Sequence, residues 1–301
     1  MLELKNPRIA VPVVLFAGII WSFGPLVVRY MDNPSQVPWQ YIFGRGLTIF
    51  ILLNLYLYFE EGVKFWKNYL KIGKSGILGG SSLGIAMISF IYSITNTSAA
   101  ITLLCLAAMP FFTALLAFIF LKEQISINVW VSICIAAIGI VIMAFGNTEL
   151  NSLVGLIFGI ISSVGFSVFS VTLRWRKETP KFTTVAFAGF FCFFFATIVI
   201  LSKGHSFFAT SYNSSLFSLH GTLVCFGLIL YSIGSKAIPA AELTLLSLTE
   251  VVGGIFWVWL PLFGINEVPD TTTIIGGFFL FISLFYYSLI MRWNKRYIGL
   301  N

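Results

Sequence analysis

The sequence predicts an all-α polytopic membrane protein with ten transmembrane helices in two inverted five-helix repeats. Composition is the first indication: 58% of the 301 residues are hydrophobic, only 10% are charged, and the mean hydropathy is +0.95. A water-soluble domain carries about 25% charged residues, so lipid must be the main solvent of this surface. The composition excludes most soluble enzyme folds, DNA-binding modules and disulfide-rich secreted domains.

Apolar runs of transmembrane length are the second indication. A membrane-spanning helix needs about 20 predominantly apolar residues, whereas a β-barrel strand needs about ten with alternating polarity. The runs here are of the longer kind and do not alternate. We predict ten spans: Ile9 to Val28, Trp39 to Phe59, Ile72 to Thr95, Ala99 to Leu121, Ile127 to Phe145, Leu153 to Leu173, Phe182 to Leu201, Leu216 to Ser235, Ala241 to Phe263 and Thr272 to Met291.

The charges of the connecting segments predict the orientation. Of the 18 Lys and Arg residues, fifteen fall on one side of the predicted membrane; Arg29 and Lys203 fall on the other, and Arg45 lies within the second span. Because cytoplasmic loops hold the excess of Lys and Arg, we expect a multi-pass protein of the plasma (inner) membrane with both termini cytoplasmic. The net charge of +7 then reflects this asymmetry and not nucleic-acid binding. The first run lacks a small-x-small cleavage site and is predicted to be a retained span.

An internal repeat is the third indication. The string AAITLLCLA begins at Ala99, in the fourth span, and AAELTLLSLT begins at Ala240, in the ninth; each span finishes near a glutamate, Glu123 and Glu267. Five spans separate the two strings, and halves with an odd number of spans must enter the membrane in opposite directions. The expected units are therefore residues 1–147 and 148–301, each a five-helix repeat.

These features together resemble the EamA family of the drug/metabolite transporter superfamily. The matching strings are WQYIFGRG, which contains Arg45; AAMPFFTALLAFIFLKE, which ends at Glu123; TEVVGGIFWVWLPLFGINE in the ninth span; and the pair Gly276 and Gly277 in the tenth. Val251 replaces the proline that the family often has after the ninth-span glutamate, and about three extra residues lie near Pro261. The resemblance implies transport of small organic solutes such as amino acids and metabolites, often outward.

The predicted function is secondary active transport of a small organic solute, such as an amino acid, an amine or a related metabolite, by alternating access. Export and proton coupling are open options within this hypothesis. The expected partners are the solute and the lipid bilayer, with no nucleic acid, no cofactor and either a monomer or a homodimer. The alternatives are an intramembrane enzyme that acts on a lipid or its headgroup, and a non-transporting scaffold or receptor.

Two ionisable residues inside spans are the strongest candidates for substrate binding. A charge within the bilayer costs a few kcal/mol, so one that is retained usually faces a cavity or a partner. Arg45 is predicted to bind a substrate carboxylate or phosphate, and Glu250 to bind an ammonium group or to carry a coupling proton. The alternative interpretations are an interfacial Arg45 and a Glu250 held in a structural pair.

Aromatic residues within the spans are further substrate-binding candidates, since they can line an amphipathic pocket and contact an amine through cation–π interactions. The set comprises Trp21, Tyr41, Tyr92, Tyr231 and Trp257. Glu123 is predicted to cap or pair at the cytoplasmic edge, Glu267 to belong to an external loop, and Glu242 to be structural.

No catalytic motif or metal-ligand pattern is found in the sequence, and the protein is predicted not to be an enzyme. GGSSLG lacks the lysine of a P-loop, and HExxH does not occur. His205 and His220 are expected to flank a loop. The four cysteines lie inside apolar runs and are predicted to be packing residues.

Overall fold

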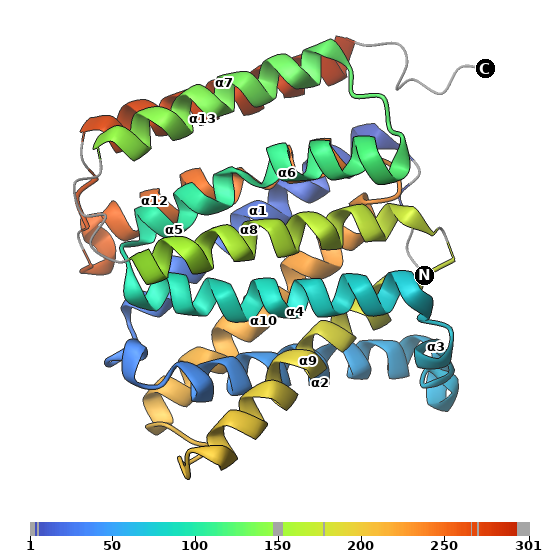
Figure 1. The fold of residues 1–301 in the computed structure, drawn as a ribbon, viewed down its shortest axis with the longest axis vertical. Coiled ribbons are helices and arrows are strands. Elements are labelled where there is room, and N and C mark those ends of the chain that lie inside the picture. Colours follow the sequence, from blue (N-terminus) through green and yellow to red (C-terminus); the bar gives the residue numbers. More distant parts are fainter. Residues whose placement is uncertain are drawn as a thin grey trace.

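The computed structural model describes residues 4, 6–146, 153–176, 178–265, 267–269 and 271–293. Within them the chain is helical throughout its membrane segments (Figure 1). The main helices are α1 (Pro7–Arg29), α2 (Pro38–Glu61), α4 (Gly73–Asn96), α5 (Ala99–Ala107), α6 (Met109–Leu116), α7 (Ile127–Gly146), α8 (Leu153–Trp175), α9 (Lys181–Ser202), α10 (Ser211–Gly234), α11 (Ala240–Leu246), α12 (Thr249–Trp259) and α13 (Thr271–Trp293).

The prediction of an all-α polytopic membrane protein is confirmed. Among the described residues, eight segments are long and apolar enough to cross a membrane by length and composition, and α7 and α13 contain two shorter apolar stretches, Ile127–Ile142 and Ile274–Ile290. Short elements connect or extend the spans: η1 (Pro34–Gln36), η2 (Gly62–Lys64), α3 (Lys67–Leu70), η3 (Ala117–Leu121) and η4 (Pro261–Phe263). Lys5, Lys177, Lys295 and Arg296, which contribute to the predicted charge asymmetry, lie outside the described residues.

The fourth and ninth spans are discontinuous, which the sequence analysis did not predict. Between α5 and α6 the break falls at Ala108, just before Pro110, whose nitrogen cannot donate to the carbonyl of Leu106. Between α11 and α12 the break falls at Ser247 and Leu248. There the hydroxyls of Ser247 and Thr249 donate to backbone carbonyls in the preceding turn, where they compete with regular helical bonding.

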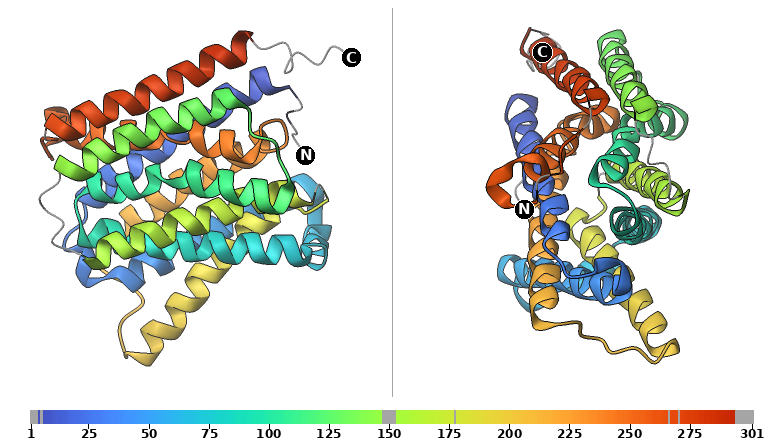
Figure 2. Two further views of the ribbon diagram at one scale, coloured as in Figure 1. Left: turned by 45° about the horizontal axis from the view of Figure 1, so that its top comes forward. Right: turned by 90° about the vertical axis from the view of Figure 1, so that its left-hand side faces the viewer.

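The helices form two walls, seen from one end in the right-hand view of Figure 2. We call α1, α10, α11 and α12 the first wall, and α4, α5, α6 and α8 the second wall. In the first wall the other helices pack on α1, and in the second wall they pack on α8. The pair α2 and α9 crosses one side of the two walls, and the pair α7 and α13 lies on the other.

Each wall combines helices from both predicted halves. The first helix of one half packs against the third and fourth spans of the other: α1 against α10 and α12, and α8 against α4, α5 and α6. The second spans pair with each other, as do the fifth, so the pairing pattern is unchanged when the halves are exchanged. The predicted boundary at residues 147–148 lies outside the described residues.

Close packing between α2 and α9 depends on a pair of glycines. A Cβ atom placed on Gly46 would lie 2.9 Å from the backbone nitrogen of Phe193 and 3.0 Å from the carbonyl oxygen of Gly189. A Cβ placed on Gly189 would in turn lie 2.9 Å from the carbonyl oxygen of Gly46. Because these neighbours are backbone atoms, a side chain can be accommodated only if the helices separate.

We therefore expect Gly46→Ala to destabilise the protein by about 1–3 kcal/mol, the usual cost of overpacking. Gly277→Ala is the matched control, because a Cβ atom placed there would have no neighbouring atom within 4 Å and alanine favours a helix over glycine by about 1 kcal/mol. Thermal unfolding in detergent should show a lower midpoint for Gly46→Ala and an unchanged or higher one for Gly277→Ala. Equal midpoints would contradict the tight crossing.

Candidate functional site

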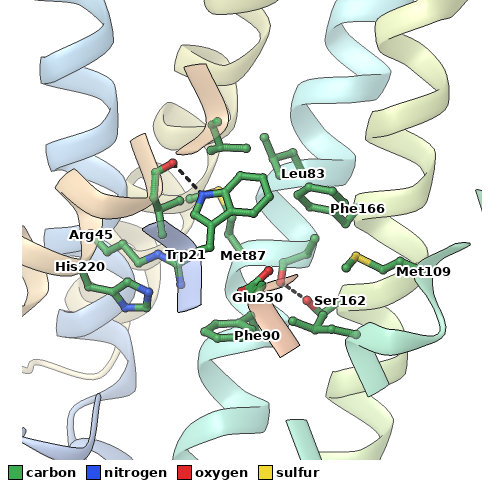
Figure 3. A pocket seen from close by; sticks show the side chains of 14 residues that line it. Trp21, Arg45, Leu83, Met87, Phe90, Met109, Ser162, Phe166, His220 and Glu250 are labelled. Atoms are coloured by element: carbon green, nitrogen blue, oxygen red, sulfur yellow. Dashed lines mark hydrogen bonds between the residues drawn. The ribbon is translucent and has the colours of Figure 1, made fainter. Parts of the chain in front are cut away.

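A small cavity of about 60 Å³ lies between the two walls, and Arg45 of α2 reaches it from the side (Figure 3). The first wall and the second wall both contribute to its lining. The residues are Trp21, Arg45, Leu83, Ala86, Met87, Phe90, Leu106, Met109, Ser162, Phe166, His220, Val224, Leu228 and Glu250. Ligand pockets typically measure roughly 300–1,000 Å³, so the walls must separate before an organic solute can enter.

Arg45 is the most informative group in the cavity. Its side chain is 5% exposed, and its Nε and Nη1 atoms have no hydrogen-bond partner among the described residues. The guanidinium carbon lies 5.4 Å from the centre of the Phe90 ring, a cation–π contact that satisfies none of the N–H donors. A buried, incompletely bonded charge is costly, and an anionic group or water in the cavity would complete its hydrogen bonds.

Glu250 lies in the first turn of α12, directly after the break in the ninth span. In Figure 3 its carboxylate is directed into the space between Arg45 and Met109. Among the described residues, no guanidinium nitrogen of Arg45 lies within 4.0 Å of a carboxylate oxygen of Glu250. The positive end of the α12 dipole favours a negative charge here. The two candidate charges therefore share one cavity without neutralising each other by direct contact.

His220 is a cavity residue that the sequence analysis misplaced. It was expected to flank a loop, but it lies within α10, is 2% exposed and lines the cavity next to Arg45. Its Nδ1 atom hydrogen-bonds to the hydroxyl of Tyr41, whose ring stacks on Phe217 with the centres 4.8 Å apart. This bond fixes the orientation of the imidazole. The signal in the sequence was an ionisable residue inside the eighth apolar run, the same signal that identified Arg45.

Trp21 is the one aromatic candidate from the sequence that lines the cavity. Its Nε1 donates to the carbonyl oxygen of Val224 over 3.2 Å, which joins α1 to α10. The indole meets the Phe166 ring edge-on, with the centres 5.6 Å apart. These contacts fix two aromatic surfaces from opposite walls at one side of the cavity.

The other four aromatic candidates do not belong to the lining. Tyr41 and Tyr231 lie behind it; the Tyr231 hydroxyl pairs with Ser170 at 2.7 Å, and the Tyr231 ring contacts Trp21. Tyr92 packs against Trp39 and Phe158. Trp257 stacks on Phe23 and donates to Ser22 Oγ over 2.8 Å. In this arrangement these residues support the helices around the cavity.

The repeat contains a signal for two lining residues that the sequence analysis missed. Trp21 lies eight residues before Arg29, and Phe166 lies eight before Arg174. Met109 lies ten residues after Ala99, and Glu250 ten after Ala240. Each pair occupies matching positions of the two predicted halves, and all four side chains line the cavity.

Three glutamates outside the cavity that the sequence analysis considered have partners. Arg29 pairs with Glu267, and Arg174 pairs with Glu123. Glu242, in the first turn of α11, accepts a hydrogen bond from the hydroxyl of Tyr287. Glu242 thus links α11 to α13.

Comparison with known proteins gives a consistent result. Residues 8–145 match the family model described as the EamA-like transporter family. A protein named "uncharacterized transporter" from Helicobacter pylori strain J99 is 29% identical over 164 residues, and a protein of the same name from strain 26695 is 28% identical over the same length. Each alignment covers 54% of this chain and 52% of the relative, so the chain spans about half the length of the curated relatives it matches.

The fold is also found in a solved structure. A crystal structure of a protein matches with a TM-score of 0.70 and 16% identity, covering 95% of this chain and 98% of the other. At this identity the likeness concerns the fold alone. The sequence motifs, the family model over the N-terminal part of the chain and the named relatives agree, and residues 8–145 are similar to the EamA-like transporter family.

Proposed function

We propose that the protein is a secondary transporter that moves a small organic solute by alternating access. The proposed solute carries an anionic group for Arg45 and an amine or other cationic group for Glu250. Amino acids, amines and related metabolites are the classes to test.

The observation that carries this proposal is the state of Arg45. It is buried within a span, faces a cavity, and has two N–H groups without a partner among the described residues. A structural arginine of this burial normally has all its donors bonded, because an orphaned charged donor is expensive. A site that receives a carboxylate accounts for the charge and its incomplete hydrogen bonding together.

The arrangement of the helices supports movement around this site. The cavity lies between two walls that are each built from both predicted halves, next to the breaks in the fourth and ninth spans. Discontinuous helices at a central site and rocking of helix bundles are typical of inverted-repeat transporters. We infer that the halves 1–147 and 148–301 are such repeats.

The proposed orientation places both termini in the cytoplasm. The start of α1, the end of α13 and α3 lie at one end of the bundle in Figure 1. In a variant without native cysteines, we expect a membrane-impermeant thiol reagent to label His205→Cys in intact cells and to leave Lys67→Cys unlabelled until the cells are opened. Both positions are exposed outside the spans. The reverse pattern would invert the topology.

Counterflow in proteoliposomes tests the transport proposal. Vesicles loaded with one unlabelled amino acid, amine, osmolyte or nucleotide derivative are diluted into the same labelled compound at trace concentration. Transient accumulation of label above equilibrium, absent from protein-free vesicles, identifies a carried solute. If no member of the panel accumulates while the protein converts a lipid substrate, the intramembrane-enzyme alternative replaces this proposal. Inactivity in both assays, with the protein folded, favours the scaffold or receptor.

A further inference from the structure

Two arginines that the proposed binding site does not use occupy matching positions at opposite ends of the bundle. Arg29 is the last residue of α1, and Arg174 is the penultimate residue of α8. Each lies eight residues, or about 12 Å of helix, beyond its cavity-lining aromatic residue, Trp21 or Phe166. The helices α1 and α8 run in opposite directions (Figure 1), so their C-terminal ends, which carry Arg29 and Arg174, lie at opposite ends of the bundle.

Arg29 connects the first wall to the second. Its Nε donates to Glu267 Oε1, in the segment after α12 of its own wall. Its Nη1 and Nη2 atoms donate to the carbonyl oxygens of Ile94 and Thr97, at 3.3 and 3.2 Å, where α4 of the second wall ends. The carbonyls at the end of a helix lack intrahelical donors and carry partial negative charge, so they favour a guanidinium.

Arg174 repeats this arrangement at the other end. Its Nε donates to Glu123 Oε1 over 2.6 Å, just after η3 of its own wall. Its Nη1 donates to the carbonyl oxygens of Ser235 and Ile238, at 3.1 and 2.8 Å, in the turn between α10 and α11 of the first wall. The other carboxylate oxygen of Glu123 accepts from the backbone nitrogen of Ala240 over 3.3 Å, which adds a second bond between the walls.

The two sets share a chemical design. In each, a glutamate of the same wall orients the guanidinium, and the guanidinium bonds to two backbone carbonyls of the opposite wall. Both ion pairs are only partly exposed, with side-chain exposures of 18% and 36% for Arg29 and Glu267, and 25% and 20% for Arg174 and Glu123. A planar fork with five donors can make these bonds at once, whereas an ammonium group cannot match the geometry.

We propose that these sets are two alternating latches: Arg29 with Glu267 closes the cavity on one side of the membrane, and Arg174 with Glu123 closes it on the other. This inference rests on the proposed transport function, and it names the residues that close the cavity on each side of the membrane. For the cavity to open toward one end, the walls must separate there, which breaks the arginine-to-carbonyl bonds at that end and leaves the opposite set intact. Both latches are formed in this structure, in agreement with the small cavity.

Accessibility of a cavity cysteine tests the latches without knowledge of the substrate. Met87→Cys, in a variant lacking native cysteines, places a thiol in the cavity lining. Its labelling by an impermeant reagent is measured separately in right-side-out and inside-out vesicles. We expect Glu267→Gln to raise the labelling rate from the Arg29 end about tenfold and to lower it from the other, since losing one charge-assisted bond shifts an opening equilibrium by about that factor. Glu123→Gln should do the reverse.

Two sets of variants separate a latch from a merely stabilising ion pair. Arg29→Lys keeps the charge beside Glu267 but not the fork, so we expect labelling between that of the parent and Arg29→Gln. Lys203→Gln removes a cation from the same end outside the latch and should leave labelling at the parent rate. Thermal stability in detergent identifies variants that unfold. If a variant of the Arg29 latch unfolds, Arg29→Lys takes its place in the labelling experiment.

The outcomes distinguish this proposal from the transport proposal. Reciprocal changes in labelling support the latches even if no solute is carried in counterflow, in which case the transport function fails alone. Demonstrated counterflow with unchanged labelling in folded Glu267→Gln and Glu123→Gln overturns the latches alone. An increase from both ends in either variant also contradicts them, because it indicates general loosening.

Discussion

Arg45→Ala is expected to raise the half-saturation concentration for a carried carboxylate about 100-fold or more. A guanidinium that binds a carboxylate through two charge-assisted bonds contributes about 1.5–3 kcal/mol per bond, and in this cavity no other arginine is available among the described residues to replace it. The measurement is concentration-dependent counterflow in proteoliposomes. Arg45→Lys should fall between the parent and Arg45→Ala, because it retains the charge and loses the two-donor geometry.

Arg176→Ala is a matched control for this prediction. Arg176 is an exposed arginine outside the cavity lining, and its guanidinium lies over the ring of its neighbour Trp175. Its removal should leave the half-saturation concentration unchanged. If folded Arg45→Ala also shows the parent value for every carried solute, Arg45 has a structural role and the proposed anion site is wrong.

The architecture could be predicted because lipid imposes a simple rule on sequence. Every span must satisfy its backbone internally and present about 20 apolar residues, so composition alone delimits the helices. The breaks at Ala108 and at Ser247 and Leu248 were missed, since they interrupt no apolar run. Pro110, and the hydroxyls of Ser247 and Thr249, were the local signals.

The charged residues of the site could be predicted from the sequence, whereas the aromatic residues that line it could not. An ionisable residue inside a span is costly wherever it points, so Arg45 and Glu250 were identifiable without coordinates. An aromatic residue is inexpensive on any face of a membrane helix, and whether Tyr92 faces Trp39 or the cavity depends on helix rotation, which apolar sequence does not specify. The repeat adds the missing constraint, because Phe166 corresponds to Trp21 and Met109 to Glu250.

The arginine partners of the glutamates near the span ends could not be predicted from the sequence. Glu123 was expected to cap or pair at the cytoplasmic edge and Glu267 to lie in an external loop, and their arginine partners lie 51 and 238 residues away in the sequence. Identifying Arg174 and Arg29 requires knowing that the first helix of each half packs against the third and fourth spans of the other. The sequence repeat predicts the existence of two halves, while the exchange of helices between walls follows only from the fold.

Glu250→Gln is expected to abolish solute uptake driven by a pH gradient and to retain exchange of solute for solute. Glutamine is close to glutamate in size and keeps a carbonyl acceptor, but it cannot bind and release a proton in the relevant pH range. Glu250 faces the cavity from the first wall, across from Met109 of the second, so a bound amine could contact it and displace its proton. Exchange moves no net proton and therefore does not require this step.

Both activities must be measured in one proteoliposome preparation, with thermal stability as the check on folding. Glu178→Gln removes an exposed acid from the loop between α8 and α9 and should reproduce the parent in both assays. Parent-like uptake under a pH gradient in Glu250→Gln would eliminate the proton role. Loss of exchange as well as uptake in a folded variant would instead assign Glu250 to direct binding of the solute's cationic group. Retained exchange with abolished gradient-driven uptake separates the two roles, because the carboxylate is then needed for coupling while the remaining cavity residues still bind the solute.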